Sequence, residues 1–270
     1  MSNYNKRLER SLNKIYSFQT ILDTVKESLS KIIYPAIVKY DSVSLSSTPF
    51  TPNRRVNRKV QKEVDPKAAW GTLMDKVNQL NSLCNVFGVD PDIIAQLYKQ
   101  LFYFISSEVL NALFVRKEMC NRATGVTIKH NISTLEQWIR DNAPQGSEEA
   151  ASILKTLQPV INASQLFQAR KTIEGVDDLV SSLHELTAPQ ILKLLPLSTP
   201  QGYEEVPSEF LPAVVRKLKE IRPASELDEV CWAKPFYDSP LNISYCPSTV
   251  DLETVQIPQG MSIPGHIILK

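Results

Sequence analysis

Apolar residues recur every three or four positions through the first 36 residues, which is the spacing of an amphipathic helix. The stripe comprises Leu8, Leu12, Ile15, Phe18, Leu22, Val25, Leu29, Ile32 and Ala36. A dimeric coiled coil and a long helix laid along a helical domain both show such a stripe. Because Ile21, Ile33 and Ile37 widen the apolar face, the pattern favours the helix within a domain. Tyr34-Pro35 is expected to bend or end that helix.

Residues 41–66 break this period. They combine Ser, Thr and Pro with five basic residues between Arg54 and Lys62, a composition that predicts a flexible loop. Phosphate added near the basic residues would offset their charge and order or release the loop. The candidate acceptors are Ser47, Thr48 and Thr51. A solvated linker without a regulatory role is the competing interpretation.

Helical spacing resumes at residue 68 and predicts a helix to Phe87 that Gly88 ends. Asp90-Pro91 then supplies an N-cap acceptor and a proline for the first turn of the next helix. From Leu97 to Val115 apolar residues fall on almost every face, as in a helix buried on all sides. Four polar residues interrupt the run, which argues against a membrane span of about 20 apolar residues. They are Ser106, Ser107, Glu108 and Asn111.

This buried helix is expected to continue to about Met119 and to be followed by a basic turn at Gly125. Ser133 and Glu136 have the spacing of a capping box, which places the next helix start there. Thr187 and Gln190 repeat that spacing before residues 191–195, and residues 210–221 form the last clear helix. Pro159 is expected to kink a helix that begins near Ser147.

Beyond Pro223 the prolines are too frequent for long helices, so the tail is predicted to be extended and to pack back on the helices. The chain is therefore predicted to be all-α, a multi-helix bundle in which a long N-terminal helix joins antiparallel helices. We divide it into the long helix at 1–40, the basic Ser/Thr/Pro loop at 41–66, the helical bundle at 67–222 and the extended segment at 223–270.

Composition adds little that is specific. The 270 residues carry a net charge of +1, so no overall field favours nucleic acid. The four cysteines lie far apart without metal-ligand spacing, and the first ten residues do not form a signal segment, which favours a reduced, cytoplasmic setting. Lys117 and Arg122 lie near Cys120 in the sequence and would favour a lowered pKa, but a structural cysteine is the preferred interpretation. With no catalytic or cofactor motif, we expect neither enzymatic activity nor a cofactor.

The central stretch LYKQLFYFISSEVLNALFVRKEMCNRATGVTIKHNISTLEQWIRD, at residues 97–141, resembles the dilute (DIL) domain in the globular tail of class V myosins. Its most specific segments are LFVRKEMC at 113–120 and NISTLEQWIRD at 131–141. Further similar segments are SQLFQARK at 164–171, LTAPQILKLLPLSTP at 186–200 and DLETVQIP at 251–258. The resemblance thus runs over most of residues 68–270.

The resemblance implies a helical cargo-binding tail that links an actin-based motor to vesicles and organelles through Rab-type GTPases and adaptor proteins. It also implies docking on the motor head in an inhibited state, without nucleic-acid binding or membrane insertion. The basic residues of that docking correspond to Lys99 and to Arg170-Lys171. The basic turn adds Lys117, Arg122 and Lys129 as candidate partner contacts. Ordinary solvated charge is the alternative interpretation of Lys99, Arg170 and Lys171.

Two departures from the family pattern stand out. Relatives often carry Arg-Lys before the glycine of the basic turn, whereas this chain has Ala123-Thr124. No motor, light-chain-binding repeats or stalk precedes residue 1, so we interpret the chain as the second half of a tail whose parent dimerises through a coiled coil. Scaffold proteins of cell junctions and Ras signalling also carry DIL domains and are the competing family.

Overall fold

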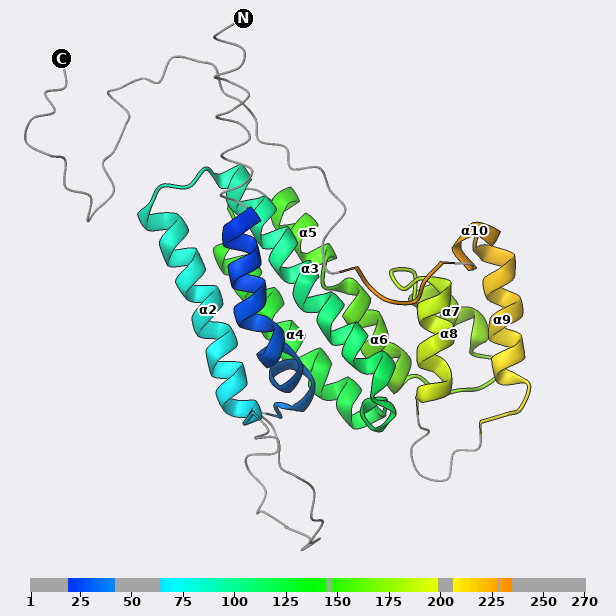
Figure 1. The fold of residues 1–270 in the computed structure, drawn as a ribbon. Helices are drawn as coiled ribbons and strands as arrows, with labels where there is room; N and C mark the ends of the chain where they lie inside the picture. The colour runs from blue at the N-terminus through cyan, green and yellow to red at the C-terminus, as the bar shows by residue number, and fades with distance from the viewer. Residues whose placement is uncertain (1–18, 42–63, 145–146, 199–205, 228, 235–270) are drawn as a thin grey trace, which may run out of the picture.

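The structure, a computed structural model, describes residues 19–41, 64–144, 147–198, 206–227 and 229–234. Within these ranges every regular element is a helix, which confirms the predicted fold class. The larger group of helices comprises residues 19–39, α2 (Pro66–Val86), α3 (Pro91–Val115), α4 (Arg122–Asn142), α5 (Ser147–Lys155) and α6 (Gln158–Gln168). The smaller group, beside it in Figure 1, comprises α7 (Val176–Ser182), α8 (Ala188–Leu197), α9 (Phe210–Ile221) and α10 (Ala224–Leu227). None of these helices is long and apolar enough to cross a membrane.

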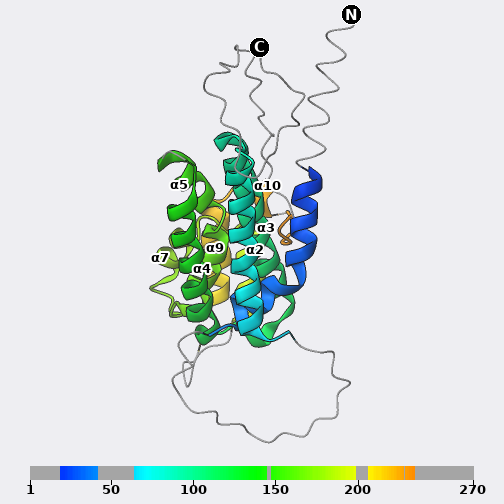
Figure 2. The same cartoon turned by 90° about the vertical axis from the view of Figure 1, so that its left-hand side faces the viewer.

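Helix α3 occupies the centre of the larger group, between the N-terminal helix and α5 in the view of Figure 2. Its side chains are buried on nearly every face, as the sequence pattern predicts. Tyr98 and Phe102 pack against Trp138 of α4, with ring centroids 5.3 and 5.8 Å from the indole. The indole nitrogen of Trp138 donates to Asn78 Oδ1 of α2 at 2.7 Å. One aromatic cluster therefore joins α2, α3 and α4.

The N-terminal helix is described from residue 19, so the first part of the predicted stripe lies outside the described residues. It does not end at Pro35, because the chain continues as a π-helical turn over Pro35–Lys39. That turn ends against α4, where the buried Asn131 amide donates to the carbonyls of Ile37 at 3.0 Å and Tyr40 at 2.7 Å. A side chain 94 residues further along the chain thus satisfies carbonyls that a helix end leaves without partners.

The connection between α2 and α3 follows the predicted signals. Gly88 has a φ of +57°, and its N–H donates to Asn85 O while the N–H of Val89 donates to Cys84 O. This is the Schellman pattern, which needs a left-handed residue at the position of Gly88. Asp90 then accepts a hydrogen bond from the N–H of Asp92, and Pro91 opens α3.

The predicted turn at Gly125 is wrong. Gly125 lies in the first turn of α4, which begins at Arg122 because Asn121 Oδ1 accepts from the Thr124 N–H at 3.0 Å. The turn itself lies earlier, since α3 ends at Val115 rather than Met119 and a 3-10 turn covers Lys117–Met119. The capping box assigned to Ser133 and Glu136 is also wrong, because both residues lie inside α4.

Pro159 interrupts the helix that it was expected only to kink. Helix α5 ends at Lys155 and α6 begins at Gln158, so the proline lies in a first turn, where its missing N–H leaves no bond unmade. The capping box of Thr187 and Gln190 is present at the start of α8. After α9 a single turn, α10, precedes residues 229–234, which contact α3. The rest of the predicted tail, residues 235–270, lies outside the described residues.

Candidate functional site

Four of the six predicted basic residues gather at one end of the larger group of helices. Helix α4 begins against the second half of α6, because a Cβ at Gly125 would lie 2.9 Å from Ser164 O and 3.3 Å from Gln168 Cγ. The start of α4 and the end of α6 are therefore neighbours. We call Lys117, Arg122, Arg170 and Lys171 the basic end; the first three are exposed. Sequence reasoning grouped Arg170-Lys171 with Lys99, and Lys117 and Arg122 with Lys129, and did not place these four residues together.

Lys171 is half-buried and has a structural contact as well as its charge. Its ammonium group donates to the carbonyl of Ser198, which follows the last residue of α8. A cation at a helix C-terminus interacts favourably with the helix dipole and with a free carbonyl. Lys171 therefore anchors α8 to the end of α6, in addition to any role it has with a partner.

Lys99 and Lys129 lie outside the basic end. Lys129 is exposed on α4, seven residues after Arg122, and so projects from the same side of the helix roughly 10 Å further along it. Lys99 is half-buried near the start of α3, about 24 Å along the helix axis from Val115. A partner that touches both Lys99 and the basic end must therefore span most of the length of α3.

Cys120 is a structural cysteine and not an activated thiol. Burial raises its pKa to about 11, the Glu118 carboxylate adds to the rise, and Lys171 only partly offsets it. The sulfur donates to the carbonyls of Leu113 and Arg116, which turn back from the end of α3. Its role is to close the turn between α3 and α4. The phosphorylation candidates Ser47, Thr48 and Thr51 lie outside the described residues.

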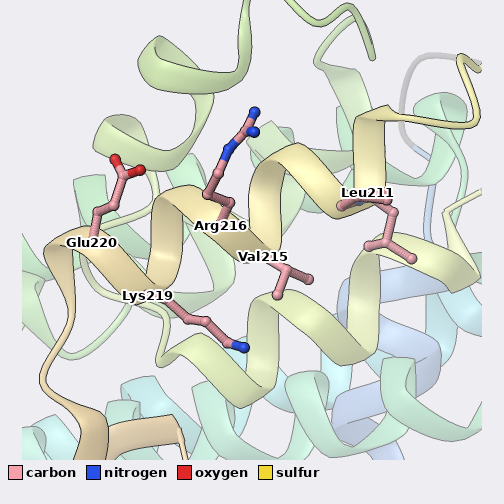
Figure 3. A pocket seen from close by; sticks show the side chains of 6 residues that line it. Leu211, Val215, Arg216, Lys219 and Glu220 are labelled. Carbon is pink, nitrogen blue, oxygen red and sulfur yellow. The ribbon is translucent and has the colours of Figure 1, made fainter.

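Sequence reasoning missed the outer face of α9. There an open hollow of about 630 Å³ lies over Leu211, Pro212, Val215, Arg216, Lys219 and Glu220. Figure 3 shows Leu211, Val215 and Lys219 pointing to one side of the helix, and Arg216 and Glu220 pointing to the other. The face next to this row, about 100° around the helix, packs into the core through Phe210, Val214 and Leu218. Helix α9 is thus apolar on two sides, and its outer apolar row has cations at its border.

The signal for this surface was present in the sequence. Leu211 and Val215 are four residues apart, in addition to the row of Phe210, Val214 and Leu218 that the core requires. Leu211 keeps 38% of its surface exposed. A second apolar row on a single amphipathic helix indicates either a further packing partner in the chain or a binding surface.

Comparison with known proteins identifies the class. Residues 96–201 match the family model described as the DIL domain. The solved structure of Myo2-GTD in complex with Mmr1 superposes with a TM-score of 0.65 at 19% identity, covering 92% of this chain and 56% of that one. A structure described as the myosin V cargo binding domain gives a TM-score of 0.59 at 20% identity, covering 80% of this chain and 51% of that one. The helical groups described above are therefore built on the fold of a myosin cargo-binding domain.

The sequences of curated relatives give the family. Unconventional myosin-Va of Gallus gallus is 31% identical over 256 residues, and unconventional myosin-Vc of Homo sapiens is 29% identical over 272 residues. The alignments cover 92% and 97% of this chain but 13% and 15% of those relatives. The chain belongs to the class V myosin family, as part of its DIL-containing tail.

Proposed function

We propose that this chain is a non-catalytic cargo-binding module of an actin-based motor, and that it links the motor to vesicles and organelles in the cytoplasm. The DIL match carries this proposal, together with similar Myo2 tails that were solved in complex with Smy1, Inp2 and Mmr1. The expected partners are cargo adaptors and Rab-type GTPases. Relatives that are myosins over almost the whole of this chain favour this function over a junctional or Ras-signalling scaffold.

The α9 surface is the adaptor contact we propose. Leu211 and Val215 offer an apolar row, and Arg216 and Lys219 place two cations at its border. The acidic member, Glu220, lies 3.8 Å from the ammonium group of Lys217, which also pairs with Asp177 at 3.0 Å. The surface therefore fits an adaptor segment that carries apolar side chains beside acidic ones.

Binding measurements on the full chain test this contact. Leu211→Asp with Val215→Asp should weaken an adaptor complex by about 10- to 100-fold, because the double change removes the apolar anchors. Val126→Asp is the matched control, since Val126 is 52% exposed on α4. Titration calorimetry against a panel of adaptors, and against Rab GTPases loaded with GTP or GDP, gives the affinities. Equal loss in the control variant would argue against α9 as the contact.

We also propose that basic side chains dock the tail on its own motor head and inhibit the motor ATPase. The proposal is supported by the charge gathered at the basic end and by Lys99, which the resemblance assigns to the same docking. Lys99→Glu with Arg170→Glu should relieve inhibition in trans while leaving helicity unchanged. Arg170 is a cleaner choice than Lys171, because reversal at Lys171 would also release the end of α8. Inhibition that survives the double reversal would exclude these residues as the contact.

A further inference from the structure

A second cleft lies where α3 meets the junction of α5 with α6 and the start of α8. Its volume is about 300 Å³, and most of the residues that line it have polar side chains, although apolar atoms form the larger part of the lining surface. The side chains that matter here are Tyr103, Ser106, Lys155, Glu185, Thr187 and Gln190, and Ala233 borders the cleft from outside the helices. Ala233 belongs to residues 229–234, which we call the C-terminal strap.

The strap is held chiefly through its backbone. The Asn111 amide nitrogen donates to the carbonyl of Ala233 at 3.0 Å, and Asn111 Oδ1 accepts from the N–H of the same residue at 2.9 Å. Any residue except proline can make this pair of bonds, since both groups belong to the main chain. The one aromatic anchor is Trp232, whose ring meets that of Phe114 edge-on at 5.8 Å. Domains that bind extended peptides use the same combination of main-chain hydrogen bonds for affinity and a contact site for one side chain.

The C-terminal strap does not fill its binding site on α3 completely. Trp232 keeps 48% of its surface exposed and Val230 keeps 73%. In the cleft below, Ser106 is 99% buried, and its Oγ has no hydrogen-bond partner among the described residues. Buried hydroxyl groups normally find partners, and the methyl group of Ala233 offers none. A longer polar side chain at that position would reach into the cleft.

We propose that Asn111, Phe114 and this cleft form a peptide-binding groove that the chain's own strap occupies, and that an extended segment of a partner displaces the strap. The displacing segment has an aromatic residue at the place of Trp232, followed by a residue with a hydroxyl or carboxamide side chain at the place of Ala233. This inference rests on the proposed function only in taking that partner to be a cargo adaptor. The groove lies apart from the α9 surface, since they share no lining residue.

A labelled peptide of residues 226–236 tests the groove on the full chain. In the wild-type chain the tethered strap competes at high effective concentration, so the peptide should bind weakly. Trp232→Ala in the chain removes the strap's aromatic anchor and so frees the groove. Peptide binding should then tighten by about tenfold or more, as measured by fluorescence polarisation. Adding Asn111→Ala should abolish the gain, whereas Val115→Ala, exposed on the same helix, should preserve it.

Changes in the peptide test recognition without touching the fold. A peptide with Ala233→Pro lacks the N–H that Asn111 accepts and should bind about tenfold more weakly. One with Ala233→Gln should bind more tightly than the parent. Equal binding to the wild-type and Trp232→Ala chains, or undiminished binding of the proline peptide, would overturn the groove. Because no adaptor is used, a negative result in the peptide experiment would not affect the proposed α9 contact. A negative result in the α9 experiment would likewise not affect the proposed groove.

Discussion

At the residue scale, Gly125 sets how closely α4 can approach α6. An added Cβ would lie 2.9 Å from the backbone oxygen of Ser164 and 3.1 Å from Phe167 Cβ. The backbone oxygen cannot rotate away, so the two helices would have to separate. The sequence displays a glycine between basic residues, which is typical of a turn, but the reason for it lies 39 residues away in α6. That is why the turn was predicted and the helix contact was not.

Gly125→Ala should therefore lower the free energy of unfolding by about 1–3 kcal/mol through overpacking. Gly71→Ala is the matched control, because Gly71 is exposed in α2 and an added Cβ there meets nothing within 4 Å. That change should stabilise the chain by about 0.5–1 kcal/mol, since alanine favours a helix. Urea denaturation followed by circular dichroism gives both values. Equal effects of the two substitutions would contradict the close contact.

The three described cysteines differ in burial and therefore in the reactivity expected of their thiols. Burial raises the pKa of Cys84, and raises that of Cys120 to about 11, whereas Cys231 is partly exposed on the strap. At pH 8 about one in a thousand Cys120 thiols is ionised, and the thiolate is the reactive form. Of these three cysteines, iodoacetamide should thus modify Cys231 first, with Cys120 reacting faster as the pH rises towards 11. Mass spectrometry of timed samples checks the order, and Cys120 reacting as fast as Cys231 would refute it.

At the scale of elements, Asn131 ties the N-terminal helix to α4. Its amide nitrogen lies 3.0 Å from Ile37 O and 2.7 Å from Tyr40 O, and the side chain is 1% exposed. In the sequence Asn131 is the first residue of the segment NISTLEQWIRD, and nothing local shows this bond. Helix existence follows from apolar spacing and caps, as at Asp90 and Thr187. Which helix ends meet, and which polar side chain joins them, depends on contacts distant in sequence.

Asn131→Ala should cost about 1–3 kcal/mol, because it leaves buried carbonyl groups without a donor. The loss should be local to the N-terminal helix, so hydrogen exchange of residues 29–38 should accelerate more than that of α3. Thr134→Ala, exposed one turn further along α4, is the control and should change neither. Uniform acceleration across the larger group of helices would show that the bond does not act as a local tie.

At the scale of the whole molecule, the candidate surfaces lie on different parts of one scaffold. The basic end lies where the start of α4 meets the end of α6. Helix α9 lies at the edge of the smaller group, away from the N-terminal helix (Figure 1). The fold class and the family were readable from the sequence because they depend on apolar spacing and on the segments between residues 97 and 171. The α9 surface has a signal in the second apolar row of that helix, but which face the core leaves uncovered is known only once the helices are packed.

The most direct test of the central claim is titration calorimetry of the chain with class V myosin cargo adaptors from its own organism. We predict micromolar or tighter binding of at least one adaptor, weakened about 10- to 100-fold by Leu211→Asp with Val215→Asp and unchanged by Val126→Asp. Circular dichroism should show all three proteins equally helical. A folded chain that binds no adaptor in the panel would contradict the account of this protein as a cargo-binding module.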